Sequence, residues 1–354
     1  MIKVPLSRLR PGMKLARAVL GSDGNVLLAA GIRIKPAYIR ALEMLGYTTV
    51  FVAEPGLEDV HPPELIREQT RISAIQLIRE TFYTAKGQHG INVRRIRAAV
   101  DDIVDEVLYD RDALVHLGDI RGHDNATFAH SVNVAVLCCL IGRGMGYNRT
   151  QLVELTLGGL LHDVGKIFIP PEILNKEEPL TGEEIAIVRR HPRDGFELLR
   201  TTPGIPLRSA HMALQHHELM DGSGYPRGLK GHEIHPYARI NAVADAFDAL
   251  TSDRPYRLGV SPMQALNMIH ELRATHYDPK VIAVLRSFVA PYPVGSKVRL
   301  STGDRAVVVA VQRDNLERPD VRIIERNGVP QQPPYEEVKL SQRPDVAIVD
   351  VEEP

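Results

Sequence analysis

The chain has 354 residues, enough for more than one domain, and its formal net charge at pH 7 is -1. A chain this close to neutral lacks the basic surface of a general nucleic-acid binder, so no nucleic-acid polymer is expected as a partner. The first ten positions mix polar and apolar residues, and no apolar run reaches the roughly 18 residues of a membrane span. We therefore expect no signal peptide, no membrane span and a cytoplasmic protein, in which the adjacent Cys138 and Cys139 are buried, reduced thiols.

Residues 1–60 predict a small α+β module at the N-terminus. The elements expected in it are a hairpin around the turn at 22–25, a helix at 36–45 and a strand at 48–52. Prolines and a glycine then interrupt any regular element over 54–63, which predicts a linker.

Helices are expected to dominate residues 64–290. Apolar residues recur every three or four positions between Ile96 and Leu108, which predicts an amphipathic helix. Further helices are expected at about 127–146, 150–166, 181–200, 206–217, 236–252, 261–273 and 278–290. Strand-like runs separated by turns then predict a small β-rich extension over 291–354, either antiparallel or barrel-like. The fold class is therefore mainly α, a helical bundle with a small domain at each end.

The apolar run from Leu155 to Leu161 ends in the sequence His-Asp-Val-Gly-Lys, residues 162–166. Imidazole and carboxylate groups are ligands of borderline and hard divalent metals, and one carboxylate can offer an oxygen to each of two ions. Lys166 follows Asp163 by about one helical turn, and a cation beside a metal can hold phosphate oxygens. This segment predicts two metal ligands, with Asp163 able to bridge two ions, and a phosphate-binding lysine.

Other histidines and one aspartate also have mostly apolar neighbours on the expected helices: His130, His191, His216, His217 and Asp245. Taken singly, His130 is better explained as a core or cap histidine and His191 as part of a turn. Burying all of these groups without partners would cost roughly a few kcal/mol each, whereas bound metals satisfy them together. Their joint occurrence favours a metal cluster, and the remaining histidines, which lack this context, are interpreted as surface or structural residues.

Two polar stretches suggest substrate contacts. Residues 221–226, Asp-Gly-Ser-Gly-Tyr-Pro, form either a simple tight loop or a support that presents the ring or hydroxyl of Tyr225 to a ligand. Asp248 shares a helical face with Asp245, and Arg254 and Arg257 follow it. These residues fit either a charged solvated turn or a second phosphate site.

Residues about 120–290 resemble an HD-GYP domain, the branch of the HD superfamily that hydrolyses cyclic di-GMP in bacteria. The matching segments are, in order, His130-Ser131, residues 162–166, Arg190-His191-Pro192, His216-His217-Glu218, residues 221–226 and residues 244–251. The resemblance implies metal ligands at His130, His162, Asp163, His191, His216, His217 and Asp245. It also implies catalytic roles for His162, Asp163 and Lys166, and substrate contacts at Lys166, Tyr225, Asp248, Arg254 and Arg257.

The implied reaction is hydrolysis of cyclic di-GMP to pGpG, and after a second cut to GMP, by a metal-activated hydroxide. Iron and manganese are the metals that the family implies. Some members hold a third metal through a glutamate one helical turn before the first histidine, but here that position is Ala126. Two metal ions are therefore favoured over three, unless Asp124 reaches the site. Leu219-Met220 is a second departure, at positions where the family often has polar or aromatic residues.

Alternatives to a cyclic di-GMP phosphodiesterase stay open. The chain could be a cyclic-dinucleotide receptor with little turnover, although a pure receptor needs neither Lys166 nor the full ligand set. It could also hydrolyse a related cyclic dinucleotide such as 3′,3′-cGAMP, which the motifs do not distinguish from cyclic di-GMP. By analogy, residues 1–60 could regulate or dimerise the protein, and a diguanylate cyclase or another signalling protein is an expected partner.

Overall fold

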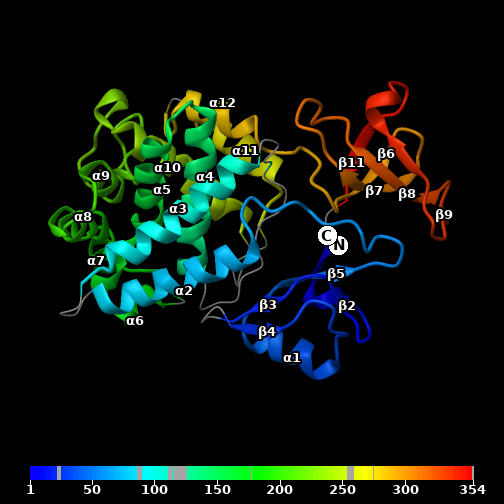
Figure 1. The fold of residues 1–354 in the computed structure, drawn as a ribbon, viewed down its shortest axis with the longest axis horizontal. Helices are drawn as coiled ribbons and strands as arrows, with labels where there is room; N and C mark the ends of the chain where they lie inside the picture. Colours follow the sequence, from blue (N-terminus) through cyan, green and yellow to red (C-terminus); the bar gives the residue numbers. More distant parts are fainter. Residues whose placement is uncertain are drawn as a thin grey trace.

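The structure is a computed structural model that describes residues 1–21, 25–85, 90–110, 114, 126–176, 178–252, 259–273 and 275–352. It contains an N-terminal α+β region, a helical central region and a β-rich C-terminal region (Figure 1). The predicted fold class, mainly α with smaller mixed or β-rich parts at the two ends, is confirmed.

The N-terminal region is built on a small antiparallel sheet with the strand order β1-β5-β2. Its elements are β1 (Ile2–Pro5), β2 (Lys14–Leu15), β3 (Val19–Leu20), β4 (Val26–Leu28), α1 (Pro36–Met44) and β5 (Thr49–Ala53). Strands β3 and β4 pair as the expected hairpin, and residues 22–24 of its turn lie outside the described residues. Leu42 of α1 packs with Val50 and Val52 of β5, so an apolar core joins helix and sheet.

The central region is a bundle of helices around two apolar cores. Its described α-helices are α2 (Glu68–Ala85), α3 (Val93–Tyr109), α4 (Ala126–Gly144), α5 (Arg149–Leu161), α6 (Pro171–Leu174), α7 (Gly182–Val188), α8 (His191–Thr201), α9 (Leu207–Gln215), α10 (Pro236–Thr251), α11 (Pro262–Glu271) and α12 (Pro279–Arg286). One core joins α2 and α3 to α4 and α5, and the other joins α4 to α10, α11 and α12. Helix α4 contributes to both cores and is therefore the central element of the bundle.

Two of the expected helices end earlier than their apolar patterns indicate. Helix α5 ends at Leu161 rather than at 166, and the 3-10 helix η3 (Val164–Phe168) follows it. The single helix expected over 181–200 is divided at Arg189 and Arg190 into α7 and α8, and Pro192 lies in the first turn of α8. A proline has no N–H for a helical bond to the preceding turn, so the helix restarts here. Both breaks place histidines at helix ends.

Helix α4 also corrects the expectation that no apolar run is long enough to span a membrane. Its segment Thr127–Gly144 has that length and a mean hydropathy of 1.3, although 67% of it is buried inside the protein. A helix that packs against two cores needs apolar side chains on most of its surface.

The C-terminal region is an antiparallel sheet with the strand order β10-β8-β7-β6-β11, and the short strand β9 pairs with β8. Its strands are β6 (Lys297–Leu300), β7 (Arg305–Ala310), β8 (Asp320–Arg326), β9 (Val329–Pro330), β10 (Glu337–Lys339) and β11 (Ile348–Val351). The segment 54–63, expected to be a linker, has no helix or strand, yet Leu57 and Val60 are buried against Val294 and Val307. The segment 54–63 and this sheet are therefore in direct contact.

Candidate metal centre

The predicted metal ligands come from separate elements and meet in the helical region. His130 lies on α4 and Asp245 on α10, whereas His162 and Asp163 directly follow α5. His191 is the first residue of α8, and His216 and His217 follow the end of α9. The early ends of the helices matter here, because a residue at a helix terminus can project along the helix axis into the space between neighbouring elements.

Asp163 lies at the middle of the cluster, and its two carboxylate oxygens face different histidines. Its Oδ1 atom is 3.4 Å from Nε2 of His191 and 3.7 Å from Nε2 of His216. Its Oδ2 atom is 3.4 Å from Nε2 of His162 and 4.0 Å from Nε2 of His130. A carboxylate in this position can provide one oxygen to each of two neighbouring cations.

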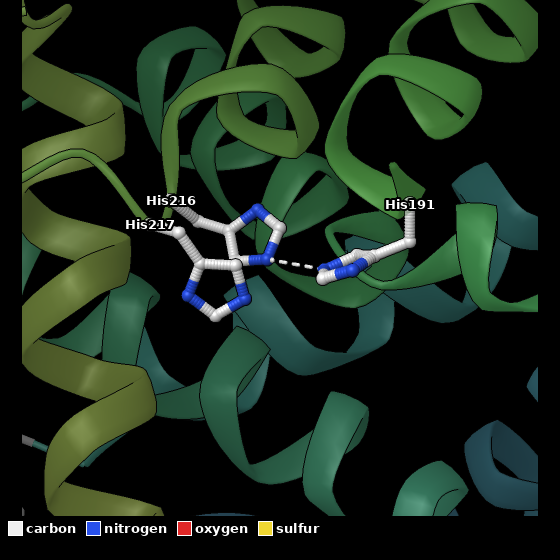
Figure 2. Close-up of side chains that lie close together, drawn as sticks. All are labelled: His191, His216 and His217. Carbon is white, nitrogen blue, oxygen red and sulfur yellow. Dashed lines mark hydrogen bonds between the residues drawn. The ribbon is translucent and has the colours of Figure 1, made fainter. Parts of the chain in front are cut away.

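The ligand atoms form two groups that Asp163 links, because Asp163, His162 and His216 also lie within 4.8 Å of one another. His191, His216 and His217 form one group, with ligand atoms within 4.8 Å of one another, and Figure 2 shows their rings turned toward a common point. His130, His162 and Asp245 form the other, with the same limit of 4.8 Å. His130 Nε2 and Asp245 Oδ1 are 3.1 Å apart in this second group.

Backbone carbonyls orient the buried imidazoles. The Nδ1 atoms of His162, His191 and His216 lie 2.8, 2.7 and 2.9 Å from the carbonyl oxygens of Gly159, Val188 and Ala213, respectively. A carbonyl only accepts, so Nδ1 must carry the proton and donate it, which leaves the Nε2 lone pair of a neutral ring facing the cluster. This is the tautomer that a metal-binding histidine needs.

The cluster has the electrostatics of a cation site. The Nε2 atoms of His191 and His216 are 3.2 Å apart, so two lone pairs face each other when both rings are neutral. Burial lowers the pKa of both imidazoles, and it lowers the pKa of His217 to about 4. Protonation of one ring, which would remove the repulsion between the lone pairs, is therefore disfavoured. Burial also favours a neutral Asp163 carboxyl, but Lys166 and His162 outweigh it and hold the pKa of Asp163 well below its usual range. Neutral imidazoles beside an ionised carboxylate fit a divalent metal ion.

His130 is held between two carboxylates. Its Nδ1 atom is 2.7 Å from Oδ2 of Asp248, on the side of the ring opposite the Nε2 contact with Asp245. Burial disfavours the imidazolium, yet the hydrogen bonds to Asp245 and Asp248 raise the pKa of His130 to about 9. Negative oxygens that favour a proton at Nε2 also favour a metal cation in its place.

The partly exposed side chains of the cluster, among them His217, mark its open side, and the other side chains are buried. The side chains of His162, Asp163, His191 and His216 are at most 2% exposed. Those of His130, Asp245 and Lys166 are 14%, 21% and 26% exposed, respectively. The ammonium of Lys166 lies on this open side, 2.6 Å from Oδ2 of Asp163.

The loop at 221–226 lies beside the cluster. The Tyr225 ring stacks on His217 at 4.7 Å between ring centres, and the Arg189 guanidinium lies 5.0 Å from the centre of the same ring. Glu218 fixes the loop by accepting hydrogen bonds from the backbone N–H groups of Arg227 and Leu229. A side chain at Gly224 would collide with the His217 carbonyl, because a Cβ atom there would lie 2.4 Å from it. No motif in the sequence pointed to Arg189, whereas Glu218 directly follows the paired histidines.

The remaining predicted site residues have different outcomes. Asp248, expected to contact substrate, is buried, and its carboxylate receives hydrogen bonds from Asn133 and the His130 ring. Its predicted role in substrate binding stays a prediction. Ala126 is the first residue of α4. Asp124, Arg254 and Arg257 lie outside the described residues.

A family model for the HD domain matches residues 119–281. A cyclic di-GMP phosphodiesterase from Pseudomonas aeruginosa is 34% identical over 266 residues, which cover 75% of this chain and 63% of that protein. This chain is an HD-GYP domain protein. An HD domain implies divalent metal binding, and the histidine and aspartate clusters of this HD-GYP protein can hold such ions.

Further relatives of the HD-GYP chain differ in the substrate that their names give. A 3′3′-cGAMP-specific phosphodiesterase from Vibrio cholerae is 41% identical over 160 residues, or 45% of this chain and 37% of that protein. Among solved structures, an HD-GYP-related protein from Bdellovibrio bacteriovorus has the same fold, with a TM-score of 0.50 at 18% identity over 80% of this chain and 97% of that one. The chain spans less than two thirds of the length of the curated relatives it matches.

Proposed function

We propose that this protein is a metal-dependent phosphodiesterase that hydrolyses cyclic di-GMP to pGpG and, after a second cut, to GMP. The observation that carries the proposal is the position of Asp163, whose two oxygens face two different sets of histidines. A carboxylate that can bind two neighbouring cations suits the two-metal hydrolysis of a phosphodiester. The curated relatives named as cyclic di-GMP phosphodiesterases support the substrate.

Two divalent cations, iron or manganese, are the proposed cofactors. His191, His216, His217 and Oδ1 of Asp163 would hold one ion, and His130, His162, Asp245 and Oδ2 of Asp163 would hold the other. When bound, such ions supply Lewis acidity for the phosphoryl group and for activation of water. Ala126 at the start of α4 has no ligand atom, which favours two ions over three.

Residues on the open side of the cluster would bind the substrate. Lys166 supplies a positive charge for the non-bridging phosphate oxygens. Burial raises the pKa of Tyr225 to about 12, so its hydroxyl keeps its proton and can donate a hydrogen bond to phosphate. Arg254 and Arg257 stay predicted phosphate contacts. A cytoplasmic location, a homodimer and a signalling partner such as a diguanylate cyclase also stay predictions.

Hydrolysis of 3′,3′-cGAMP is the second candidate activity, because relatives specific for that molecule match the chain at comparable identity. Competition between the two cyclic dinucleotides in one reaction separates the candidates. The preferred substrate is the one whose product forms first at equal concentrations.

The test of the proposed function is hydrolysis by protein purified without oxygen and supplied with Fe(II) or Mn(II). We expect pGpG or GMP from the wild type, and at least about a 100-fold loss of rate in Asp163→Ala, which removes the shared ligand. His232→Ala is the matched control, since His232 is exposed and outside the cluster. Tight binding of cyclic di-GMP without product in either metal would contradict an enzyme and favour a receptor.

A further inference from the structure

We propose that Arg71 and Asn133 are positioning residues for the metal ligand His130, which they hold through Asp248. The inference rests on the proposed metal centre and extends it beyond the HD-GYP motifs. Arg71 lies on α2, which precedes the segment matched by the HD domain family model, and Asn133 lies one helical turn after His130 on α4.

The contacts form a continuous path of hydrogen bonds. The Arg71 guanidinium donates to Oδ1 of Asn133, and Nδ2 of Asn133 donates to Oδ1 of Asp248 at 2.8 Å. The other oxygen of Asp248 accepts from Nδ1 of His130 at 2.7 Å. Nε2 of His130 then faces Asp245 and the metal centre.

The chemistry of the two ends determines the orientation of the central amide. A guanidinium only donates hydrogen bonds, and an ionised carboxylate only accepts them. The side chain between Arg71 and Asp248 must therefore accept on one side and donate on the other, as the Asn133 amide does. An aspartate at 133 would repel Asp248, and a leucine would leave both neighbours without this partner.

Burial makes this support important for Asp248. The residue is only 3% exposed, and a buried carboxylate is costly unless hydrogen bonds satisfy its oxygens. The bonds from His130 and Asn133 occupy one oxygen each. With Asp248 held in place, the His130 ring has a fixed rotation and a fixed tautomer, which are the properties that outer contacts give to metal ligands.

Helix α2 is well placed to transmit movement through this path. It is the first helix after the segment that contacts the C-terminal sheet, and it packs against both α4 and η3, which carries Lys166. A shift of α2 would therefore alter the hydrogen-bonded support of His130 and the packing of η3 together. The path gives the N-terminal part of the chain a physical connection to the metal centre.

The test compares Mn(II) binding to metal-depleted wild type, Asn133→Leu, Arg71→Ala, Arg71→Lys and Arg79→Ala by titration followed with electron paramagnetic resonance. We expect Asn133→Leu to weaken binding at one of the two sites by about 10- to 100-fold, the usual effect of removing an outer contact of a ligand. Arg71→Ala should weaken the same site, and Arg71→Lys should recover part of the affinity because it restores a donor with positive charge. Arg79→Ala is the matched control, since this arginine of α2 lies 5.7 Å from the ring centre of the exposed Tyr83.

Thermal unfolding of each metal-depleted variant separates positioning from a purely structural role. Reduced stability of Asn133→Leu and Arg71→Ala with wild-type Mn(II) affinity would overturn the inference, as would a wild type that binds no Mn(II). If Asn133→Leu does not fold, the comparison of Arg71→Ala with Arg71→Lys decides alone. Because binding is measured without turnover, a wild type that binds Mn(II) but hydrolyses no cyclic dinucleotide would contradict the proposed function while leaving this test intact.

Discussion

The contacts of Tyr225 narrow the roles that its side chain can have. From the sequence, either the ring or the hydroxyl was predicted to contact a ligand. In the structure the ring already stacks on His217 and lies beside the Arg189 guanidinium. The ring therefore packs against His217 of the candidate metal centre, and the hydroxyl is the group that could donate to phosphate. Arg189 becomes a residue that holds Tyr225 in position.

Replacement of Arg189 by alanine should raise the KM for cyclic di-GMP about 2- to 5-fold, with little change in kcat. This range corresponds to the loss of roughly 0.5–1 kcal/mol for a solvent-exposed cation–π contact. Steady-state kinetics of Arg189→Ala, Arg189→Lys and Arg190→Ala measure the effect. The lysine variant keeps a cation and should retain most of the affinity, and Arg190→Ala serves as the control because that neighbouring side chain is exposed. An equal rise in KM for Arg190→Ala would point to general charge rather than to the contact with Tyr225.

At the scale of elements, close packing of η3 against α8 brings Asp163 and His191 together. Gly165 of η3 leaves no room for a side chain, since a Cβ atom there would lie 2.0 Å from the His191 carbonyl oxygen and 2.6 Å from the Gly195 nitrogen. Backbone atoms cannot move aside as the end of a flexible side chain can. A glycine is therefore required where the two ligand-bearing elements touch.

Gly165→Ala should separate η3 from α8, lower the free energy of unfolding by about 1–3 kcal/mol and reduce metal content. Urea unfolding of the metal-depleted protein and metal analysis of the loaded protein measure the two effects. Gly182→Ala is the matched control, because a Cβ at this position in the first turn of α7 would meet no neighbouring element within 4 Å. A Gly165→Ala protein with wild-type stability would show that the elements can part without cost.

The helices were predictable from the sequence, but their ends at the site were not. Apolar periodicity indicates the buried face of a helix, and the apolar pattern continues past Leu161 and past Arg189. The helical hydrogen bonding of the backbone nevertheless stops at both places. The motifs did indicate which histidines and aspartates cluster. The carbonyls that orient the imidazoles carry no such signal, since a carbonyl at Gly159 or Val188 is the same whatever the side chain. The sequence pattern did not indicate Asn133 or Arg71 either, because their roles depend on contacts between helices.

At the scale of the whole molecule, the segment 54–63 connects the two ends of the chain. Leu57 is 1% exposed and packs with Val294 and Val307 near the C-terminal sheet. Arg322 of β8 also binds both carboxylate oxygens of Asp59, each at 2.6 Å. This ion pair is near the surface and contributes little by itself, so the apolar contact is the main attachment. Prolines in the segment predicted a break in regular structure, which does not exclude burial.

Leu57→Ala should loosen this attachment without entering the metal centre. Removing a buried leucine side chain costs about 2–5 kcal/mol, and here that cost falls on the contact between the N-terminal segment and the C-terminal sheet. We expect a lower melting temperature and faster proteolytic cleavage within 54–66, with Mn(II) affinity changed far less than by Asn133→Leu. Glu58→Ala is the matched control, because Glu58 is the next residue along the chain and its side chain is exposed. If Leu57→Ala instead weakens Mn(II) binding as strongly as Asn133→Leu, the contact acts on the metal centre, and the path through α2 is the structural connection that would carry the effect.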